Sequence, residues 1–231
     1  PAGPWGNVMR KAEAPNPIQF TTADGLVCER IYSAQPGEGS WASMTFGENG
    51  LLYVSPERGR LLQFNLNGIL REETAQNLNG FQIDYECAPP EVIPFDLGSA
   101  QGLEWAFDSL YLNVAGNPKD KGGLHRLQDK DGDGVFDQQE HLARYGPGGE
   151  HGAHGIRKGP DGWLYLVHGN HTKPPVGPEN QSVMHAYQPF QNGAEDVLLA
   201  RLWDPRGHAK GVMAPGGELW RTDERGSTWQ R

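Results

Sequence analysis

Four segments of this 231-residue sequence share one pattern, in which a short apolar stretch leads through a tight turn into a second stretch that carries an aromatic residue. The four aromatic residues are separated by 58, 54 and 55 positions, and they are Tyr53, Tyr111, Tyr165 and Trp220. A near-constant period of this length in a β-rich chain predicts the blades of a β-propeller, each of about four strands. An irregular β-sandwich with chance hairpins is the alternative.

Turn-forming residues support the all-β interpretation. The chain contains 32 glycines and 18 prolines, which is typical of many tight turns between short strands and unlike a helical protein. The expected fold is therefore an all-β propeller, with about four blades visible as part of a larger six-bladed propeller. Residues 1–25 are expected to form an extended arm, and residues 26–231 a propeller domain that is incomplete at its C-terminal end.

A twelve-residue acidic stretch, residues 129–140, matches the spacing of a calcium-binding loop. Calcium prefers six to eight oxygen ligands, and such a loop supplies them from positions 1, 3, 5, 7, 9 and 12, with glycine at position 6. A solvated acidic turn without metal is the alternative. The flanking sequence indicates strands and no amphipathic helix, so we expect a calcium loop that rigidifies a β-scaffold. The expected ligands are Asp129, Asp131, Asp133, the Val135 carbonyl, Asp137 and Glu140.

Charge and cysteine content narrow the classes of partner. The formal net charge of −9 gives no basic run for nucleic acid or an anionic membrane, and no apolar stretch has the length of a membrane span. Cys28 and Cys87 match no haem or zinc spacing, and both a disulfide and two free thiols fit them. Calcium loops without helices suit extracellular calcium concentrations, so we expect a periplasmic or secreted protein.

Histidines concentrate around the third repeat, as His151 and His154 before its first stretch and His168 and His171 after its second. A hairpin that turns near residue 160 would bring all four to its open end. Three interpretations compete: general acid–base catalysis by a histidine beside Glu150, coordination of Cu, Zn or Fe by imidazoles, and hydrogen bonding that only fixes the loops. The cluster as a whole favours a pocket.

Longer motifs carry a resemblance to a known family: Ala100-Gln101-Gly102-Leu103, Gly149-Glu150-His151-Gly152-Ala153-His154, Gly169-Asn170-His171-Thr172-Lys173 and Arg206-Gly207-His208-Ala209. Over roughly residues 25–231 the chain resembles the membrane-bound dehydrogenase β-propellers. That family is often fused to a c-type haem domain and is distantly similar to the soluble sugar dehydrogenases that use pyrroloquinoline quinone (PQQ).

The resemblance implies roles for individual residues. In the sugar dehydrogenases a catalytic histidine stands eight residues before a Gly-Pro-Asp turn, and His151 has this position here. It is thus the implied base, with His154 and Glu150 beside it. The sugar dehydrogenases also carry a Gly-His-Arg-Asn motif that helps to bind PQQ, and this chain has Gly207-His208-Ala209-Lys210 instead. The implied cofactor-binding residues are therefore His208, Arg206, Lys210 and His171.

Two functions follow as expectations. The first is a dehydrogenase that oxidises the hydroxyl group of a sugar or alcohol with PQQ and passes electrons to haem on a c-type cytochrome or another domain. The second is a propeller without catalytic activity that serves as a structural or docking subunit of a larger complex outside the cytoplasm.

Overall fold

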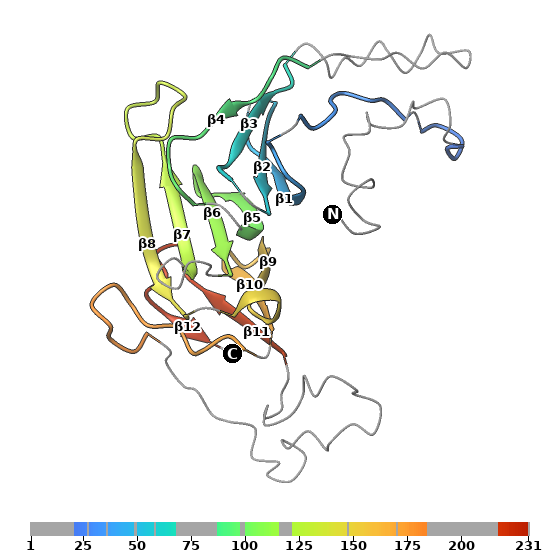
Figure 1. The fold of residues 1–231 in the computed structure, drawn as a ribbon. Helices are drawn as coiled ribbons and strands as arrows, with labels where there is room; N and C mark the ends of the chain where they lie inside the picture. Colours follow the sequence, from blue (N-terminus) through green and yellow to red (C-terminus); the bar gives the residue numbers. More distant parts are fainter. Residues whose placement is uncertain are drawn as a thin grey trace, which may run out of the picture.

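Three four-stranded antiparallel sheets form the framework of the part of the chain that the structure describes (Figure 1). The computed structural model describes residues 21–26, 28–35, 37–48, 50–57, 59–67, 87–97, 100–115, 122–146, 148–169, 171–183 and 217–230. In each sheet the spatial order of the strands follows their order in the chain. The expectation of an all-β fold is confirmed for these residues. The arrangement within each sheet is consistent with that of a propeller blade.

Sheet 1 consists of β1 (Trp41–Phe46), β2 (Leu51–Pro56), β3 (Leu62–Asn65) and β4 (Glu91–Val92). Sheet 2 consists of β5 (Ala100–Ala106), β6 (Ser109–Val114), β7 (Gly123–Gln128) and β8 (Gln138–Arg144). Sheet 3 consists of β9 (Ala153–Lys158), β10 (Leu164–Gly169), β11 (Gly217–Thr222) and β12 (Trp229–Gln230). A single-turn 3₁₀ helix, η4 (Gly149–His151), precedes β9.

The hairpins that open the sheets are set by local sequence. Residues 47–53 and 159–165 both read Gly-x-x-Gly-x-x-Tyr, and the second glycine has a positive φ in each, +74° at Gly50 and +80° at Gly162. A Cβ on the first glycine would lie 2.5 Å from the tyrosine ring in both hairpins, so each tyrosine packs over its own turn. The middle hairpin turns at Phe107–Asp108, where both residues have φ of 52°.

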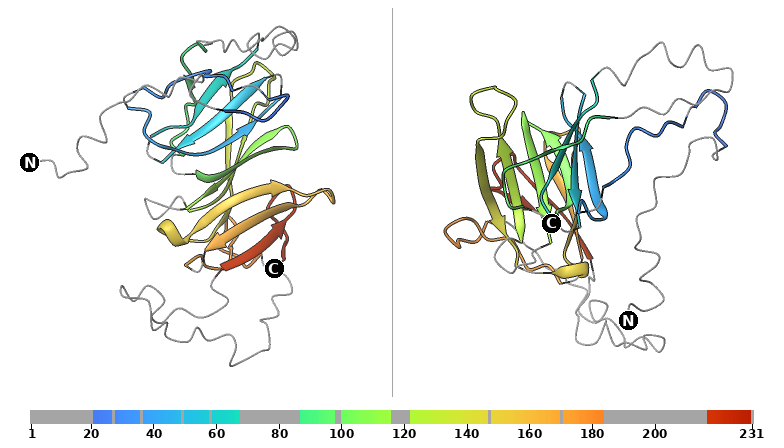
Figure 2. Two further views of the ribbon diagram at one scale, coloured as in Figure 1. Left: turned by 90° about the vertical axis from the view of Figure 1, so that its right-hand side faces the viewer. Right: turned by 45° about the horizontal axis from the view of Figure 1, so that its top comes forward.

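The three sheets are stacked face to face, and their first strands β1, β5 and β9 lie side by side (Figure 2). Apolar side chains fill both interfaces. The core between sheets 1 and 2 includes Tyr53, Leu61, Leu103, Leu110, Leu112, Leu127 and Phe136. The core between sheets 2 and 3 includes Tyr111, Leu124, Tyr145, Ile156, Leu164, Leu166, Trp220 and Trp229.

The far face of sheet 1 carries a third apolar cluster. Buried side chains of β2 and β3, including Val54 and Phe64, pack there against Ile31 and Tyr32. The chain before β1 therefore covers part of this face, and the Cys87 N–H donates to the Ile31 carbonyl at 2.9 Å.

The fourth repeat predicted from the sequence is not a separate sheet, and this part of the fold prediction is wrong. Trp220 lies on β11, the third strand of sheet 3, and pairs with Leu166 of β10. The spacing misled because the connection from β10 to β11 is long enough to place Trp220 about one repeat length after Tyr165. The described chain therefore contains three such sheets, and no closed propeller is seen in them.

Other sequence predictions meet the structure only in part. Residues 1–20 of the predicted arm lie outside the described residues, so the proposed division at residue 25 stays a prediction. Cys28 and Cys87 are both free thiols in this structure, and burial raises the pKa of Cys87. Among the residues the structure describes, no helix is both long and apolar enough to cross a membrane.

Candidate functional site

The acidic loop connects β7 to β8, in agreement with the strands expected on either side of it. The carboxylate oxygens of Asp129, Asp131 and Asp133 lie within 4.8 Å of one another, which is close enough for one cation to contact all three. The loop residues Gly132 and Gly134 have positive φ, which L side chains rarely adopt. The sequence therefore places three of its predicted ligands together.

Hydrogen bonds from backbone N–H groups hold the carboxylates of this cluster in place. The Asp129 carboxylate accepts from the N–H groups of Gly132 and Gly134, both at 2.7 Å. The Asp133 carboxylate accepts from the Val135 N–H at 2.8 Å. The hydrogen bond from the Gly134 N–H is the main reason that the pKa of Asp129 is lowered, and it keeps this carboxylate charged.

The other predicted calcium ligands have different positions. The Asp137 carboxylate accepts from the Lys130 N–H at 3.2 Å, and Val135 is exposed. Glu140 lies on β8 opposite Arg126 of β7, whose guanidinium forms an ion pair with it. None of the three belongs to the cluster formed by Asp129, Asp131 and Asp133, so their part in a calcium site stays a prediction.

A buried aromatic ties the acidic loop to sheet 1. Phe136 is 5% exposed and lies in the core between sheets 1 and 2, with its ring centroid 5.5 Å from that of Tyr53. A cation that orders the loop would therefore also stabilise the packing of sheet 2 on sheet 1.

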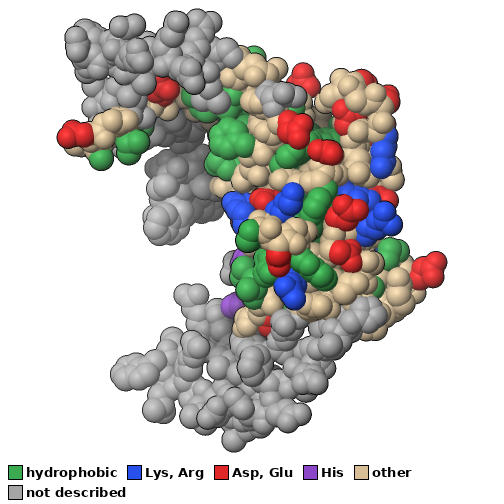
Figure 3. Space-filling view, turned by 180° about the vertical axis from the view of Figure 1, so that it is seen from behind, with side chains coloured by type: hydrophobic (Ala, Val, Ile, Leu, Met, Phe, Trp, Pro, Cys, Tyr) green, Lys and Arg blue, Asp and Glu red, His purple; other side chains and the backbone are tan. Residues whose placement is uncertain are grey.

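The histidines expected at the open end of the third hairpin divide into two environments. The rings of His151 and His171 face each other with centroids 4.6 Å apart, and the His171 N–H donates to the His151 carbonyl at 3.0 Å. His151 is half-buried and His171 is exposed. Histidine side chains also reach the surface seen in Figure 3. This pair is accessible to a ligand.

His168 has a different environment, because it lies in the core and is 1% exposed. It pairs with Ala153 across the hairpin. Its ring packs on Trp220, at 4.1 Å between centroids, and edge-on against Tyr145 at 4.8 Å. Burial, with a smaller effect of nearby His154, lowers the pKa of His168 from 6.5 to about 3. His168 is thus a neutral core residue, and the prediction that all four histidines share one open pocket is wrong for it.

A buried polar chain runs next to these histidines. The Tyr145 hydroxyl donates to the Asn113 side-chain oxygen, and the Asn113 amide donates to the His154 carbonyl at 3.0 Å. Burial raises the pKa of Tyr145 well above its usual value, so this hydroxyl remains a donor. The chain of hydrogen bonds fixes the start of β9, and with it His154, against sheet 2.

The side chains of four predicted site residues belong to parts of the chain that the structure does not describe. Arg206, His208 and Lys210 lie outside the described residues, and so does the side chain of Glu150. Their roles stay predictions.

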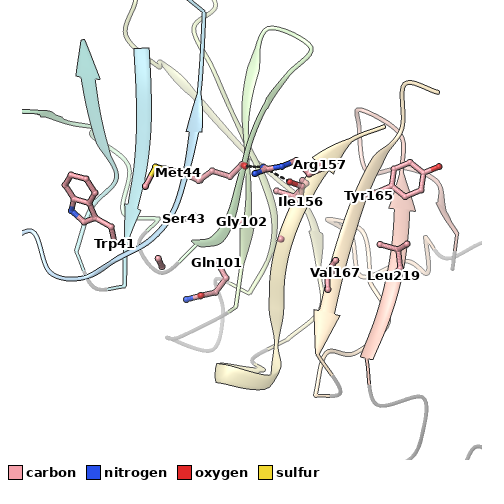
Figure 4. A pocket seen from close by; sticks show the side chains of 13 residues that line it. Trp41, Ser43, Met44, Gln101, Gly102, Ile156, Arg157, Tyr165, Val167 and Leu219 are labelled. Atoms are coloured by element: carbon pink, nitrogen blue, oxygen red, sulfur yellow. Dashed lines mark hydrogen bonds between the residues drawn. The ribbon is translucent and has the colours of Figure 1, made fainter. Parts of the chain in front are cut away.

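A pocket of about 570 Å³ lies elsewhere, along β1, β5 and β9 and against β10 and β11 (Figure 4). Its lining is mostly apolar and includes no histidine; Met44, Gln101, Arg157, Tyr165, Val167 and Leu219 contribute side chains to it. Sequence reasoning missed this pocket, because its residues come from five strands of three sheets. No pattern local in the sequence marks it, since even the exposed Val167 and Leu219 are neighbours only through the β10–β11 register.

Comparison with known proteins adds no relative. No family model matches this chain, and no match was found among curated proteins or among solved structures.

Proposed function

We propose that this chain is the calcium-stabilised, propeller-like part of a quinoprotein-type dehydrogenase that acts in the periplasm or outside the cell. The observation that carries the proposal is the face-to-face stack of three four-stranded sheets whose first strands are neighbours. His151 lies at the end of η4, directly before β9, the first strand of sheet 3. The reaction class itself rests on the sequence motifs around His151 and His208.

His151 is proposed as the general base. It is half-buried at the end of η4, and its carbonyl is held by the His171 N–H, so its position is fixed while it remains accessible. A sugar or alcohol hydroxyl bound beside it would give its proton to the imidazole. The quinone would supply the hydride acceptor, with Arg206, His208, Lys210 and His171 as its proposed contacts and a haem partner as the proposed electron acceptor.

Calcium has a structural role in this proposal. Asp129, Asp131 and Asp133 would bind the cation, and Phe136 would transmit the ordering of the loop to the core between sheets 1 and 2. Binding to the folded state alone stabilises a protein by mass action.

Dye reduction by the purified chain tests the enzymatic proposal. The chain would be incubated with PQQ and calcium and then assayed with a panel of sugars and alcohols. We expect PQQ-dependent dye reduction that falls about 10²- to 10⁴-fold in His151→Gln. The control is Arg225→Gln, an exposed position on the β11–β12 turn. Absence of PQQ-dependent turnover, or full activity in His151→Gln, would contradict the proposal.

A second candidate function is that of a structural or docking subunit without catalytic activity. The observation that favours it is the exposure of large apolar side chains on the end sheets, with Met44 and Phe46 on sheet 1 and Val167 and Leu219 on sheet 3. A chain that binds no PQQ and still self-associates or binds another subunit would support this function over the dehydrogenase.

A further inference from the structure

The outward face of sheet 3, which we name the open face, carries exposed apolar side chains. Strand residues alternate between faces, and Leu164, Leu166 and Trp220 point into the core against sheet 2. Tyr165, Val167 and Leu219 therefore point the other way, and Val167 and Leu219 are 49% and 55% exposed. These two residues pair across β10 and β11 and form one continuous apolar strip.

Corresponding faces of sheets 1 and 2 are covered by the next sheet in the chain. Tyr53 and Tyr111 occupy the place of Tyr165 on the second strands of their sheets, and they are only 2% and 0% exposed. The ring of Tyr53 stacks on Trp105 of sheet 2, with ring centroids 5.6 Å apart and an angle of 11° between the ring planes. Tyr165 is the third member of this series, and the structure places no sheet over it among the described residues.

On the outer face of sheet 1, Ile31 and Tyr32 cover the part over β2 and β3, and the matching part of that interface is left on β1. Phe46 pairs with Leu52 as Trp105 pairs with Leu110, so Phe46 occupies in sheet 1 the place of Trp105 in sheet 2. Met44 likewise corresponds to Leu103. Leu103 is 1% exposed beneath sheet 1, whereas Met44 and Phe46 are 51% and 59% exposed.

We propose that the open face of sheet 3 binds the outer face of sheet 1 of a second copy of this chain, head to tail. This contact would continue the series of interfaces already present between sheets 1 and 2 and between sheets 2 and 3. In it, Phe46 of one copy stacks on Tyr165 of the other, as Trp105 stacks on Tyr53.

Two such contacts related by a two-fold axis would join six sheets, three from each copy, into a closed ring. The inference rests on the propeller-like arrangement proposed above and is independent of PQQ or catalysis. Met44, Tyr165, Val167 and Leu219 also line the pocket of about 570 Å³ (Figure 4), so the second copy would complete the wall of that pocket.

Sedimentation velocity of the purified chain between about 1 and 100 μM tests the proposal. The expected species has twice the 25.4 kDa mass of one chain. The double variant Val167→Asp/Leu219→Asp and the single variant Phe46→Asp each disrupt one of the two faces. We expect each to weaken self-association by about 30-fold or more, because a charge would be buried at the centre of the contact. Arg225→Gln, on the β11–β12 turn and with a side chain that is 77% exposed, should not change it.

Mixing the two variants identifies the head-to-tail geometry. The Val167→Asp/Leu219→Asp chain retains an intact outer face of sheet 1, and the Phe46→Asp chain retains an intact open face, so unlike copies should associate when mixed. A monomeric parent chain at all concentrations would overturn the proposal, as would self-association unaffected by Phe46→Asp. Larger open oligomers would overturn the two-copy ring. Circular dichroism of each variant confirms folding, and dye reduction measured separately reports on the dehydrogenase proposal.

Discussion

Acidification should destabilise this protein through His168 before its carboxylates are protonated. The folded state holds His168 neutral, because burial against Trp220 and Tyr145 lowers its pKa to about 3 from 6.5. Between these two values the unfolded chain binds a proton at this residue and the folded chain does not. Stability therefore falls as the pH drops below about 6.5, and this loss is complete only near pH 3.

The size of the effect follows from the shift. One pKa unit corresponds to about 1.36 kcal/mol, so the full difference amounts to about 5 kcal/mol, of which roughly half is lost by pH 4.5. Asp129 and Asp161 also have lowered pKa values, through hydrogen bonds from the Gly134 N–H and the Tyr165 hydroxyl. Their contribution is present above the unfolded pKa of 3.8 and is lost below it, so the loss of stability between pH 6.5 and 4.5 comes from His168 and not from these carboxylates.

Urea unfolding at several pH values from 7 to 4.5, at constant calcium and followed by tryptophan fluorescence, measures the slope. The His168→Phe variant removes the titrating group. Neither ring nitrogen of His168 has a hydrogen-bond partner among the described residues, so an apolar ring should be tolerated at pH 7. We expect the variant to lose most of the slope between pH 6.5 and 4.5, and the exposed-site control His171→Gln to retain it. Equal slopes in the parent and His168→Phe would refute the reasoning.

Three further predictions concern calcium, backbone packing and the core. Chelation of calcium should lower the midpoint of thermal unfolding by an amount equivalent to about 2.7 kcal/mol when calcium is at about 100 times its Kd. Asp131→Asn should abolish this response, and the exposed-site control Asp24→Asn should keep it. An unchanged midpoint on chelation would argue against the calcium loop. Gly102→Ala should lower the free energy of unfolding by about 1–3 kcal/mol, because the new Cβ would lie 2.4 Å from the His154 carbonyl oxygen. Gly155→Ala, whose Cβ would have nothing within 4 Å, should lower it little. Similar urea midpoints for the two variants would contradict the close approach of β5 and β9. Trp229→Ala should lower the free energy of unfolding by about 3–5 kcal/mol in the same measurement, since the side chain is 0% exposed and its indole N–H donates to the Gly226 carbonyl at 2.8 Å. A decrease below about 1 kcal/mol would show that β12 does not belong to the core.

Local patterns predicted local structure well. The Gly-x-x-Gly-x-x-Tyr sequences at residues 47–53 and 159–165 form the predicted hairpins, and the strands on either side of the acidic loop are present. Trp220 was assigned to a fourth repeat because an aromatic strand at the right spacing looks the same whether it begins a sheet or continues one. Only its pairing with Leu166 distinguishes the two cases.

The candidate site shows the same division between local and tertiary information. The spacing of Asp129, Asp131 and Asp133 was sufficient to predict that they converge, because one short loop carries all three. His168 was grouped with the accessible histidines, since nothing in its neighbourhood along the chain indicates a core position. Its burial comes from Trp220, which is 52 positions away, and from Tyr145 on the sheet 2 side of the core.

The sequence alone determined three features of this chain: its all-β fold, the turns of the hairpins that open sheets 1, 2 and 3, and the acidic loop between two strands. These features depend on backbone conformations and side-chain spacings within a few residues. Tertiary structure decided the number of sheets described, which histidine is buried, and which apolar residues remain exposed on the end sheets. These depend on strand register and on the packing of one sheet against another, where residues far apart in the chain exclude water from each other.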